Sequence, residues 1–309
     1  MKRLLLSLIC VALFATGVRA ENLKTVRMTY IKPPLNVPSV VAKAQGRYEK
    51  SFKTLGLNLE YVQMESGVDQ TTALATGEIH ILNALGGASL IFAAANGADV
   101  KIIGMYGVSP RAFCLYSKDK KIKSAKSLKG KTIAGPKGTN LHELLVAYLT
   151  KAGMKESDVK FVSMDIVNAY SAMENGSVDC ALLAGATSYA AKKAGYNLVT
   201  DGTGLVAGAI VTATSQAFYD SHKDIIRTFY RTQAETLRYI KKHKAHAIEI
   251  TSQELGLARD DVANMLPLYD FHQEIRESDI KGLQKTADFL FKNKMIKNPV
   301  KIRKLILKR

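Results

Sequence analysis

The sequence predicts an α/β protein with two lobes, each made of alternating strands and helices. A stretch of the chain occurs twice, at residues 73–89 and 172–188, and an alanine, two glycines and a serine coincide at a constant offset of 99 residues. Each copy lies within a series that reads β-α-β-α-β-α-β, in which helices end at glycines. Such alternation is typical of parallel sheets whose strands are joined by right-handed crossovers.

Each copy of the repeat has the same physical pattern. A short helix ends at Gly77 or Gly176, where glycine adopts the left-handed conformation without steric cost. A short apolar run then predicts a buried strand, and a glycine-bearing loop follows at Gly86 or Gly185. Because ligands bind beyond the carboxyl ends of strands in open α/β sheets, we expect Gly86 and Gly185 to form opposed walls of one cleft.

The first twenty residues, 1–20, predict a cleavable signal peptide. Lys2 and Arg3 form a basic start, the apolar run 4–15 has the length of a signal sequence, and residues 18–20 suit a cleavage site. The run is too short to span a bilayer, so a retained anchor is the less favoured alternative. Cys10 lies inside the run rather than at its end, which disfavours a lipoprotein. We expect an exported, soluble chain.

The first half begins with a strand at residues 26–31 and a loop at 32–38, where three prolines exclude a helix. Ser39 and Asp69 are the predicted N-caps of two helices. Apolar runs and glycine stops predict the other elements of this half, which are strands at 57–63, 79–85 and 100–105 and helices at 40–54, 69–76 and 89–96.

The second half repeats this order. Its elements are strands at 131–135, 159–164, 178–183 and 197–200 and helices at 141–152, 169–175 and 187–194. Strands at 111–118 and 208–214 connect the halves, which predicts a paired hinge. Beyond them, apolar spacing predicts helices that pack on the first lobe, at 224–243, 245–254, 259–265 and 278–293. The first lobe then comprises residues 21–112 and 209–309, and the second lobe comprises 113–208.

Composition and motifs exclude several classes of function. The net charge is +17, or +14 once the three basic residues of the signal are removed, which favours anionic small molecules or acidic surfaces. Export, and the lack of interleaved basic and aromatic residues, disfavour nucleic acid. Cys114 and Cys180 lie in separate apolar runs and are interpreted as buried free thiols. No zinc spacing, serine elbow, paired-acid motif or dinucleotide fingerprint occurs, so we expect no metal and no cofactor.

The loop Gly138-Thr139-Asn140 precedes a clear helix and is the strongest candidate for anion binding. A helix N-terminus presents unpaired N–H groups and partial positive charge, and Thr139 or Asn140 offers a side-chain donor. Ordinary capping, with Asn140 as N-cap and Glu143 three residues on, is an alternative compatible with this role. Gly86-Gly87-Ala88 and Gly185-Ala186 are the candidate walls that face it, unless they are only tight turns.

Other candidates have stronger structural explanations. Lys32 and Arg111 lie nearest the ligand loops, yet each is more simply a solvated charge. Tyrosines 30, 116 and 170 suit core packing better than ring stacking on a ligand. His243 and His246 have a spacing that suits a metal, but a third ligand is missing nearby. The basic tail 292–309 suits a solvated helix end or contact with an acidic partner.

Four segments resemble those of bacterial solute-binding proteins, and their order after a signal peptide strengthens the likeness. They are Asn36-Val37-Pro38-Ser39, Ala75-Thr76-Gly77-Glu78-Ile79, Leu128-Lys129-Gly130-Lys131-Thr132-Ile133-Ala134 and Gly138-Thr139-Asn140-Leu141-His142. The sequence is most similar to the sulfonate/taurine/nitrate-binding group, which includes relatives that bind the pyrimidine precursor of thiamine. The resemblance covers nearly all of the mature chain.

The resemblance implies a two-lobed periplasmic-binding-protein-like fold of type II and a receptor that serves an ABC permease and ATPase complex in the periplasm. The protein would be a monomer that captures a small organic anion or heterocycle. The family's ligand loops, with Ala88 and Ala186 in the same walls, fall at Asn36, Val37, Pro38, Gly86, Gly87, Gly138, Thr139, Asn140 and Gly185. No tryptophan is present, so an indole wall seen in relatives is missing.

Two alternatives remain open at this stage. An enzyme on the same scaffold, similar to the fungal pyrimidine synthases, would carry a cysteine-rich motif that this sequence lacks. A sensor ectodomain would carry an anchoring segment or a signalling domain, and neither is recognisable. We therefore expect binding without chemistry.

Overall fold

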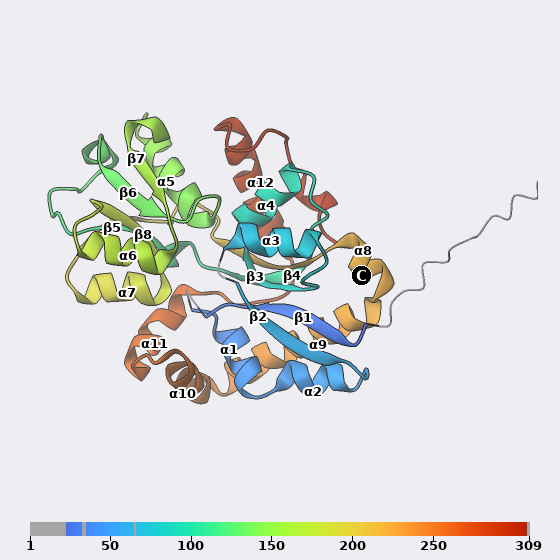
Figure 1. The fold of residues 1–309 in the computed structure, drawn as a ribbon. Helices are drawn as coiled ribbons and strands as arrows, with labels where there is room; N and C mark the ends of the chain where they lie inside the picture. Colours follow the sequence, from blue (N-terminus) through green and yellow to red (C-terminus); the bar gives the residue numbers. More distant parts are fainter. Residues whose placement is uncertain (1–22, 33–34, 65, 308–309) are drawn as a thin grey trace, which may run out of the picture.

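The protein has two α/β lobes, and a computed structural model describes residues 23–32, 35–64 and 66–307 of it (Figure 1). The predicted signal peptide, residues 1–20, lies outside the described residues. The strands of the first lobe are β1 (Thr25–Tyr30), β2 (Asn58–Gln63), β3 (Leu82–Gly86), β4 (Lys101–Val108) and β10 (Ala209–Thr214). Those of the second lobe are β5 (Phe113–Ser117), β6 (Thr132–Gly135), β7 (Lys160–Ser163), β8 (Cys180–Ala184) and β9 (Asn197–Asp201).

The two lobes repeat one sheet topology. In the second lobe the strand order is β7-β6-β8-β5-β9. In the first lobe β1 pairs with β2 and β10 lies between β3 and β4, and a parallel bridge from Met28 to Ile81 joins the two sheets in the order β2-β1-β3-β10-β4. The sequence repeat therefore reflects a repeated architecture, with β3 and β8 at the centre of each lobe.

The sheets are mixed rather than wholly parallel, which corrects one expectation. Strand β5 is antiparallel to β8 and β9, and β10 is antiparallel to β3 and β4. The predicted hinge strands do not pair with each other, because each is built into the sheet of the lobe that it enters. The chain crosses between the lobes in short neighbouring segments, where the Ser109 N–H donates to the Gly208 carbonyl over 3.0 Å.

Helices flank the sheets as the sequence predicts, apart from their ends. The helices of the two repeated units are α1 (Val37–Ala44), α2 (Arg47–Lys53), α3 (Gly67–Ala75), α4 (Gly87–Ala95), α5 (Asn140–Lys151), α6 (Ile166–Glu174) and α7 (Gly185–Lys193). The C-terminal helices are α8 (Gln216–Ser221), α9 (Lys223–Lys242), α10 (Lys244–Leu255), α11 (Arg259–Met265) and α12 (Glu277–Lys292). Short 3-10 turns are η1 (Pro110–Ala112), η2 (Ala125–Leu128), η3 (Glu156–Asp158), η4 (Leu266–Leu268) and η5 (Ile302–Lys304).

The predicted helix 40–54 is in fact two helices, because Gly46 adopts the left-handed conformation between α1 and α2, with φ of 60°. Helix α1 also begins earlier than expected, since Pro38 is tolerated in a first turn that needs no N–H from it. Ser39 is not a cap, because its hydroxyl lies 2.9 Å from the Tyr106 hydroxyl. The cap of α3 is Ser66, whose hydroxyl accepts from the Asp69 N–H.

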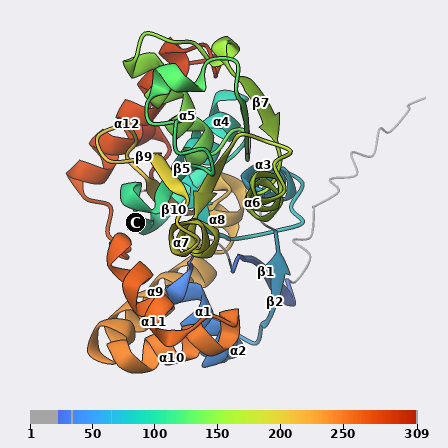
Figure 2. The same cartoon turned by 90° about the vertical axis from the view of Figure 1, so that its left-hand side faces the viewer.

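The C-terminal helices pack on the first lobe, as expected, and also contact the second. Leu283, Ala287 and Leu290 of α12 share one hydrophobic core with Leu85 and Leu90 of the first lobe. Helix α11 lies against α7 of the second lobe (Figure 1, Figure 2). The extension therefore contacts both lobes.

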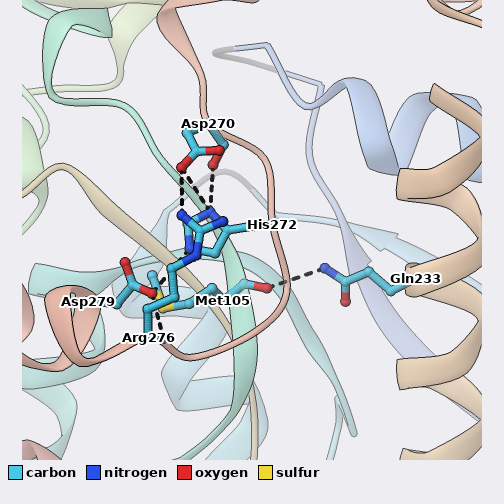
Figure 3. A network of polar contacts seen from close by, with 6 residues as sticks. All are labelled: Met105, Gln233, Asp270, His272, Arg276 and Asp279. Carbon is cyan, nitrogen blue, oxygen red and sulfur yellow. Dashed lines mark hydrogen bonds and ion pairs between the residues drawn. The ribbon is translucent and has the colours of Figure 1, made fainter. Parts of the chain in front are cut away.

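A polar network fixes the connection between α11 and α12 to the edge of β4 (Figure 3). Asp270 and Val108 exchange both backbone hydrogen bonds. The ring of His272 is buried, with Nδ1 2.9 Å from the Asp270 carbonyl oxygen and Nε2 3.2 Å from Asp279 Oδ2. Arg276 Nη1 lies 3.0 Å from Asp270 Oδ2. Within the described part of the chain, none of the helices has the length and apolar character needed to cross a membrane.

We predict that the close packing around Gly87 leaves no room for a larger side chain at this position. A Cβ there would lie 2.6 Å from Leu283 Cδ2 and 3.1 Å from the Ala209 carbonyl oxygen. Gly87→Ala should lower the free energy of unfolding by about 1–3 kcal/mol, because the buried Leu283 has little room to move. Chemical denaturation measures this. Gly86→Ala is the matched control, since its Cβ would meet nothing closer than 3.7 Å. Equal stability of the two variants would contradict the assignment.

Candidate functional site

A cleft of about 670 Å³ lies between the lobes. The first lobe contributes the end of β3 and the starts of α3 and α4, and the second lobe contributes the loop before α5 and the end of β7. The lining residues are Ile31, Asn36, Ser66, Gly67, Val68, Asp69, Gln70, Ala84, Gly86, Ser89, Phe92, Asn96, Phe113, Pro136, Lys137, Gly138, Thr139, Asn140, Leu141, Ser163, Met164, Asp165, Ile166 and Ile210. The cleft thus forms where strands end and helices begin, as the topology requires.

The charged side chains of the lining are one cation, Lys137, and two carboxylates, Asp69 and Asp165, and the rest of the lining is largely apolar. Lys137 is the one basic side chain among the described lining residues, and it is exposed beside the N-terminus of α5. Val68 and Phe92 of the first lobe and Met164 of the second supply apolar surface. The carboxylate of Asp165 accepts from the Asn168 N–H and so caps α6. Because Asp165 is engaged in this cap, Lys137 and the exposed Asp69 are the other charged groups that the cleft offers to a ligand, together with the apolar surface.

The structure gathers only some of the predicted site residues at this cleft. Those that line it are Asn36, Gly86, Gly138, Thr139 and Asn140. Four others lie behind its surface, namely Val37, Pro38, Gly87 and Ala88. Gly185 lines a second cavity, and Ala186 is next to it in α7. Gly86 and Gly185 therefore do not face one another across a single cavity, which corrects the expectation of opposed walls.

The side chain of Asn140 is used to join the lobes. Its Oδ1 accepts from the Ala88 N–H in the first turn of α4 over 3.0 Å, and its Nδ2 donates to the Ala209 carbonyl over 2.9 Å. Asn140 is 4% exposed, so both bonds are shielded from water. It is also not the N-cap of α5, because that position belongs to Thr139. The amide that the sequence suggested for a ligand thus already has protein partners.

The rest of the loop before α5 is also held by hydrogen bonds. The Thr139 hydroxyl donates to the Pro136 carbonyl over 2.8 Å and accepts from the Leu141 N–H. The Gly138 carbonyl accepts from the Ser89 hydroxyl of the first lobe over 3.0 Å. Because these side chains are engaged, the loop has a fixed conformation. Its accessible chemistry consists of backbone and the ammonium of Lys137.

Glu143 lies in the buried contact between α5 and α12 instead of in a capping box. Its Oε1 accepts from the Thr286 hydroxyl over 2.8 Å. Loss of hydration raises the pKa of this carboxyl to about 7, although the Thr286 hydrogen bond opposes the rise. The neighbouring His142 stacks on Phe161, and its burial lowers the pKa of the imidazole. The contact therefore contains an acid that titrates near neutral pH.

The remaining candidates have structural roles or lie elsewhere. Lys32 is not among the lining residues, and Arg111 lines the second cavity. Cys114 and Cys180 are buried free thiols, which confirms that prediction. The hydroxyl of Tyr239 lies 2.7 Å from the His246 Nδ1. Over residues 23–32, 35–64 and 66–307, no three His, Cys, Asp or Glu side chains gather as a metal site.

The sequence did not single out Lys137, which lies directly before the candidate loop Gly138-Thr139-Asn140. It also missed the start of α3, where Val68 and Gln70 line the cleft. The sequence did contain a pattern that could have identified Lys137, because this lysine lies just before the N-terminus of the predicted helix 141–152. No such pattern exists for Val68, since only the folded arrangement of the lobes brings α3 opposite α5.

Comparisons with known proteins place the chain in a family and agree with the two-lobed fold. A family described as "NMT1/THI5 like" matches residues 35–247. A Bacillus subtilis (strain 168) protein named for the binding of aliphatic sulfonates is 29% identical, over 99% of this chain and 95% of its own. The periplasmic aliphatic sulphonate binding protein of Escherichia coli has a similar structure, with a TM-score of 0.77 and 25% identity, covering 92% of this chain and 97% of that one. An alkanesulfonate-binding protein from Xanthomonas axonopodis pv. citri shares the fold with a TM-score of 0.83 at 24% identity, covering 94% and 100% of the two chains.

Asn140→Ala should lower the free energy of unfolding by about 1–3 kcal/mol, because the Ala88 N–H and the Ala209 carbonyl lose their partner inside the protein. Chemical denaturation measures the change. Asn175→Ala is a suitable control, since its exposed amide oxygen only accepts from nearby Ser177. The prediction is wrong if the two variants are equally stable.

Glu143→Gln should remove a pH-dependent part of the stability. The pKa of Glu143 is about 7 in the folded protein, above its unfolded value near 4.5, so the folded state binds the extra proton. This group's contribution is fully present below pH 4.5 and is lost as the pH rises to 7. From pH 5 to pH 8, denaturation should show the wild type losing up to about 3 kcal/mol more than the variant. Glu235→Gln, at an exposed acid, is the control, and parallel wild-type and Glu143→Gln profiles would contradict the prediction.

Proposed function

The chain belongs to the NMT1/THI5-like family, and on that premise we propose that it is a solute-binding protein of an ABC importer that captures a small organic sulfonate. The relatives support this ligand class, since they are named for the binding of aliphatic sulfonates. A sulfonate carries a permanent negative charge and, in this class, an apolar chain. Both parts have a counterpart in the lining of the cleft.

The observation that carries the proposal is the position of Lys137 beside the N-terminus of α5, opposite apolar side chains. A helix N-terminus carries partial positive charge, which adds to the ammonium in attracting a sulfonate head. The alkyl chain would then lie against Val68, Phe92 and Met164, where each buried methylene contributes about 0.8 kcal/mol. The head would thus be bound by the second lobe, and the tail by side chains of both lobes.

Binding would act through closure of the lobes and without chemistry. Lobe boundaries near residues 113 and 208 support such a motion, because the chain crosses between the sheets there in short segments. The protein would work as a periplasmic monomer that delivers its ligand to a permease and ATPase complex. The pyrimidine-synthase-like alternative has no observation in its favour, since the charged groups of the cleft form no paired acid and base.

Lys137→Gln should weaken the binding of butanesulfonate to the mature protein about tenfold, because a charge-assisted hydrogen bond contributes about 1.5–3 kcal/mol. Isothermal titration calorimetry measures the dissociation constant. Lys151→Gln removes an exposed lysine from the other end of α5 and should bind as the wild type does. Failure of the wild type to bind butanesulfonate, ethanesulfonate or taurine would refute the ligand class. Equal binding by both variants would refute the role of Lys137.

A further inference from the structure

A second cavity, of about 390 Å³, lies on another part of the boundary between the lobes. The second lobe contributes α7, β5 and β9, and the C-terminal extension contributes α11 and η4. The lining residues are Arg111, Ala112, Cys114, Tyr116, Gly185, Ser188, Tyr189, Lys192, Tyr196, Leu198, Asp201, Asn264, Met265 and Leu268. None of these residues lines the larger cleft, so the two cavities are separate.

Two cations line the second cavity without ion-pair partners. Neither the Arg111 guanidinium nor the Lys192 ammonium forms an ion pair or a side-chain hydrogen bond within the described part of the chain. Asp201 is the one acid among the lining residues, and its Oδ1 accepts from the Thr203 N–H over 2.8 Å. The cavity therefore has an excess of positive charge, and one of its cations is a fork-shaped guanidinium suited to a planar anion.

The rest of the lining is aromatic and apolar. Tyrosines 116, 189 and 196 provide ring faces, and Met265 and Leu268 provide an apolar wall on the side of the extension. Tyr116 and Met265 are almost fully buried, so the surface that a ligand would contact comes mainly from the half-buried Tyr189, Tyr196 and Leu268. Aromatic side chains favour aromatic ligands, because ring stacking contributes about 0.5–1.5 kcal/mol beyond the free energy gained by burying apolar surface. Cations beside rings suit a small aromatic anion.

The walls of the cavity come from both sides of the hinge. Lys193 of α7 pairs with Asp261 of α11 over 3.0 Å, and Asn264 donates to the Tyr189 hydroxyl over 3.1 Å. Arg111 lies in η1, where the chain crosses between the lobes. A relative movement of the lobes would change the spacing of these walls. Occupancy of the cavity is therefore linked to the lobe arrangement by mass action.

We propose that this cavity is a second binding site, which takes a small aromatic carboxylate or phosphate monoester. Arg111 and Lys192 would contact the anionic group, and the ring would stack among the tyrosines. The proposal does not depend on the ligand of the larger cleft. It gives Gly185 and α7 a function, since the face of α7 that carries Ser188, Tyr189 and Lys192 forms one wall.

The test uses the full mature chain and isothermal titration calorimetry with benzoate and phenyl phosphate as probes, at low salt because exposed charges are screened. Benzamide, which has the shape of benzoate but no charge, is the control ligand. We expect saturable binding of at least one anion at one site per chain, with benzamide at least about tenfold weaker. Arg111→Gln and Lys192→Gln should each weaken the anion about five- to tenfold.

Lys137→Gln is the matched control variant, since it removes a cation from the larger cleft, and it should leave the affinity for the anion unchanged. Thermal denaturation of each variant shows whether it is folded. If neither benzoate nor phenyl phosphate saturates the protein below about 10 mM, the proposal is overturned. So would binding that Lys137→Gln weakens and Arg111→Gln does not, because the probe would then occupy the larger cleft.

Discussion

The two hydrogen bonds of the Asn140 side chain are the contact on which the arrangement of the lobes depends. One amide accepts from the first turn of α4 and donates to the first residue of β10, so it joins a helix and a strand of one lobe to a helix of the other. The bonds from Ser89 to Gly138 and from Thr286 to Glu143 lie beside it. These contacts are polar, so water could replace them in the lobe movement proposed above. Separation of the lobes would then have a modest cost in free energy.

The repeated architecture was predictable because its cause is local. Apolar runs too short for helices, separated by glycine-terminated helices, indicated the strands of both lobes, and the structure has a strand at each place. The partners of β5 and β10 were not predictable in this way. Each is predicted to be a strand from its own residues, but its neighbours are strands far away in the sequence. The two predicted hinge connections do lie side by side, at Ser109 and Gly208. Some predicted helix starts were wrong for a similar reason. The Ser39 hydroxyl contacts the hydroxyl of Tyr106, which is distant in the sequence, instead of capping its own helix.

The candidate site was predictable only in part, and Gly86 and Gly185 show why. Both follow the central strand of a lobe, but Gly86 is extended, with φ of −61°, whereas Gly185 has φ of 58°. More important, the C-terminal extension lies along one lobe boundary and places α11 against α7. The sequence repeat lies within the first two hundred residues, so it cannot predict where α11, which follows much later in the chain, will pack. The wall of the cleft in the second lobe is instead the loop before α5 together with the end of β7.

The segments that cover β4 also bear on the behaviour of the protein at high concentration. An uncovered edge strand presents free N–H and C=O groups that can pair with another chain. Beyond β10, the other side of β4 pairs with Asp270 at Val108 and with Ile306 at Ile102, and the Met105 N–H donates to the Gln273 carbonyl. The last residues of the described chain thus cover part of the β4 edge of the sheet in the first lobe. A truncation before Leu305 would leave part of this edge open, and strand-to-strand aggregation would be its natural consequence.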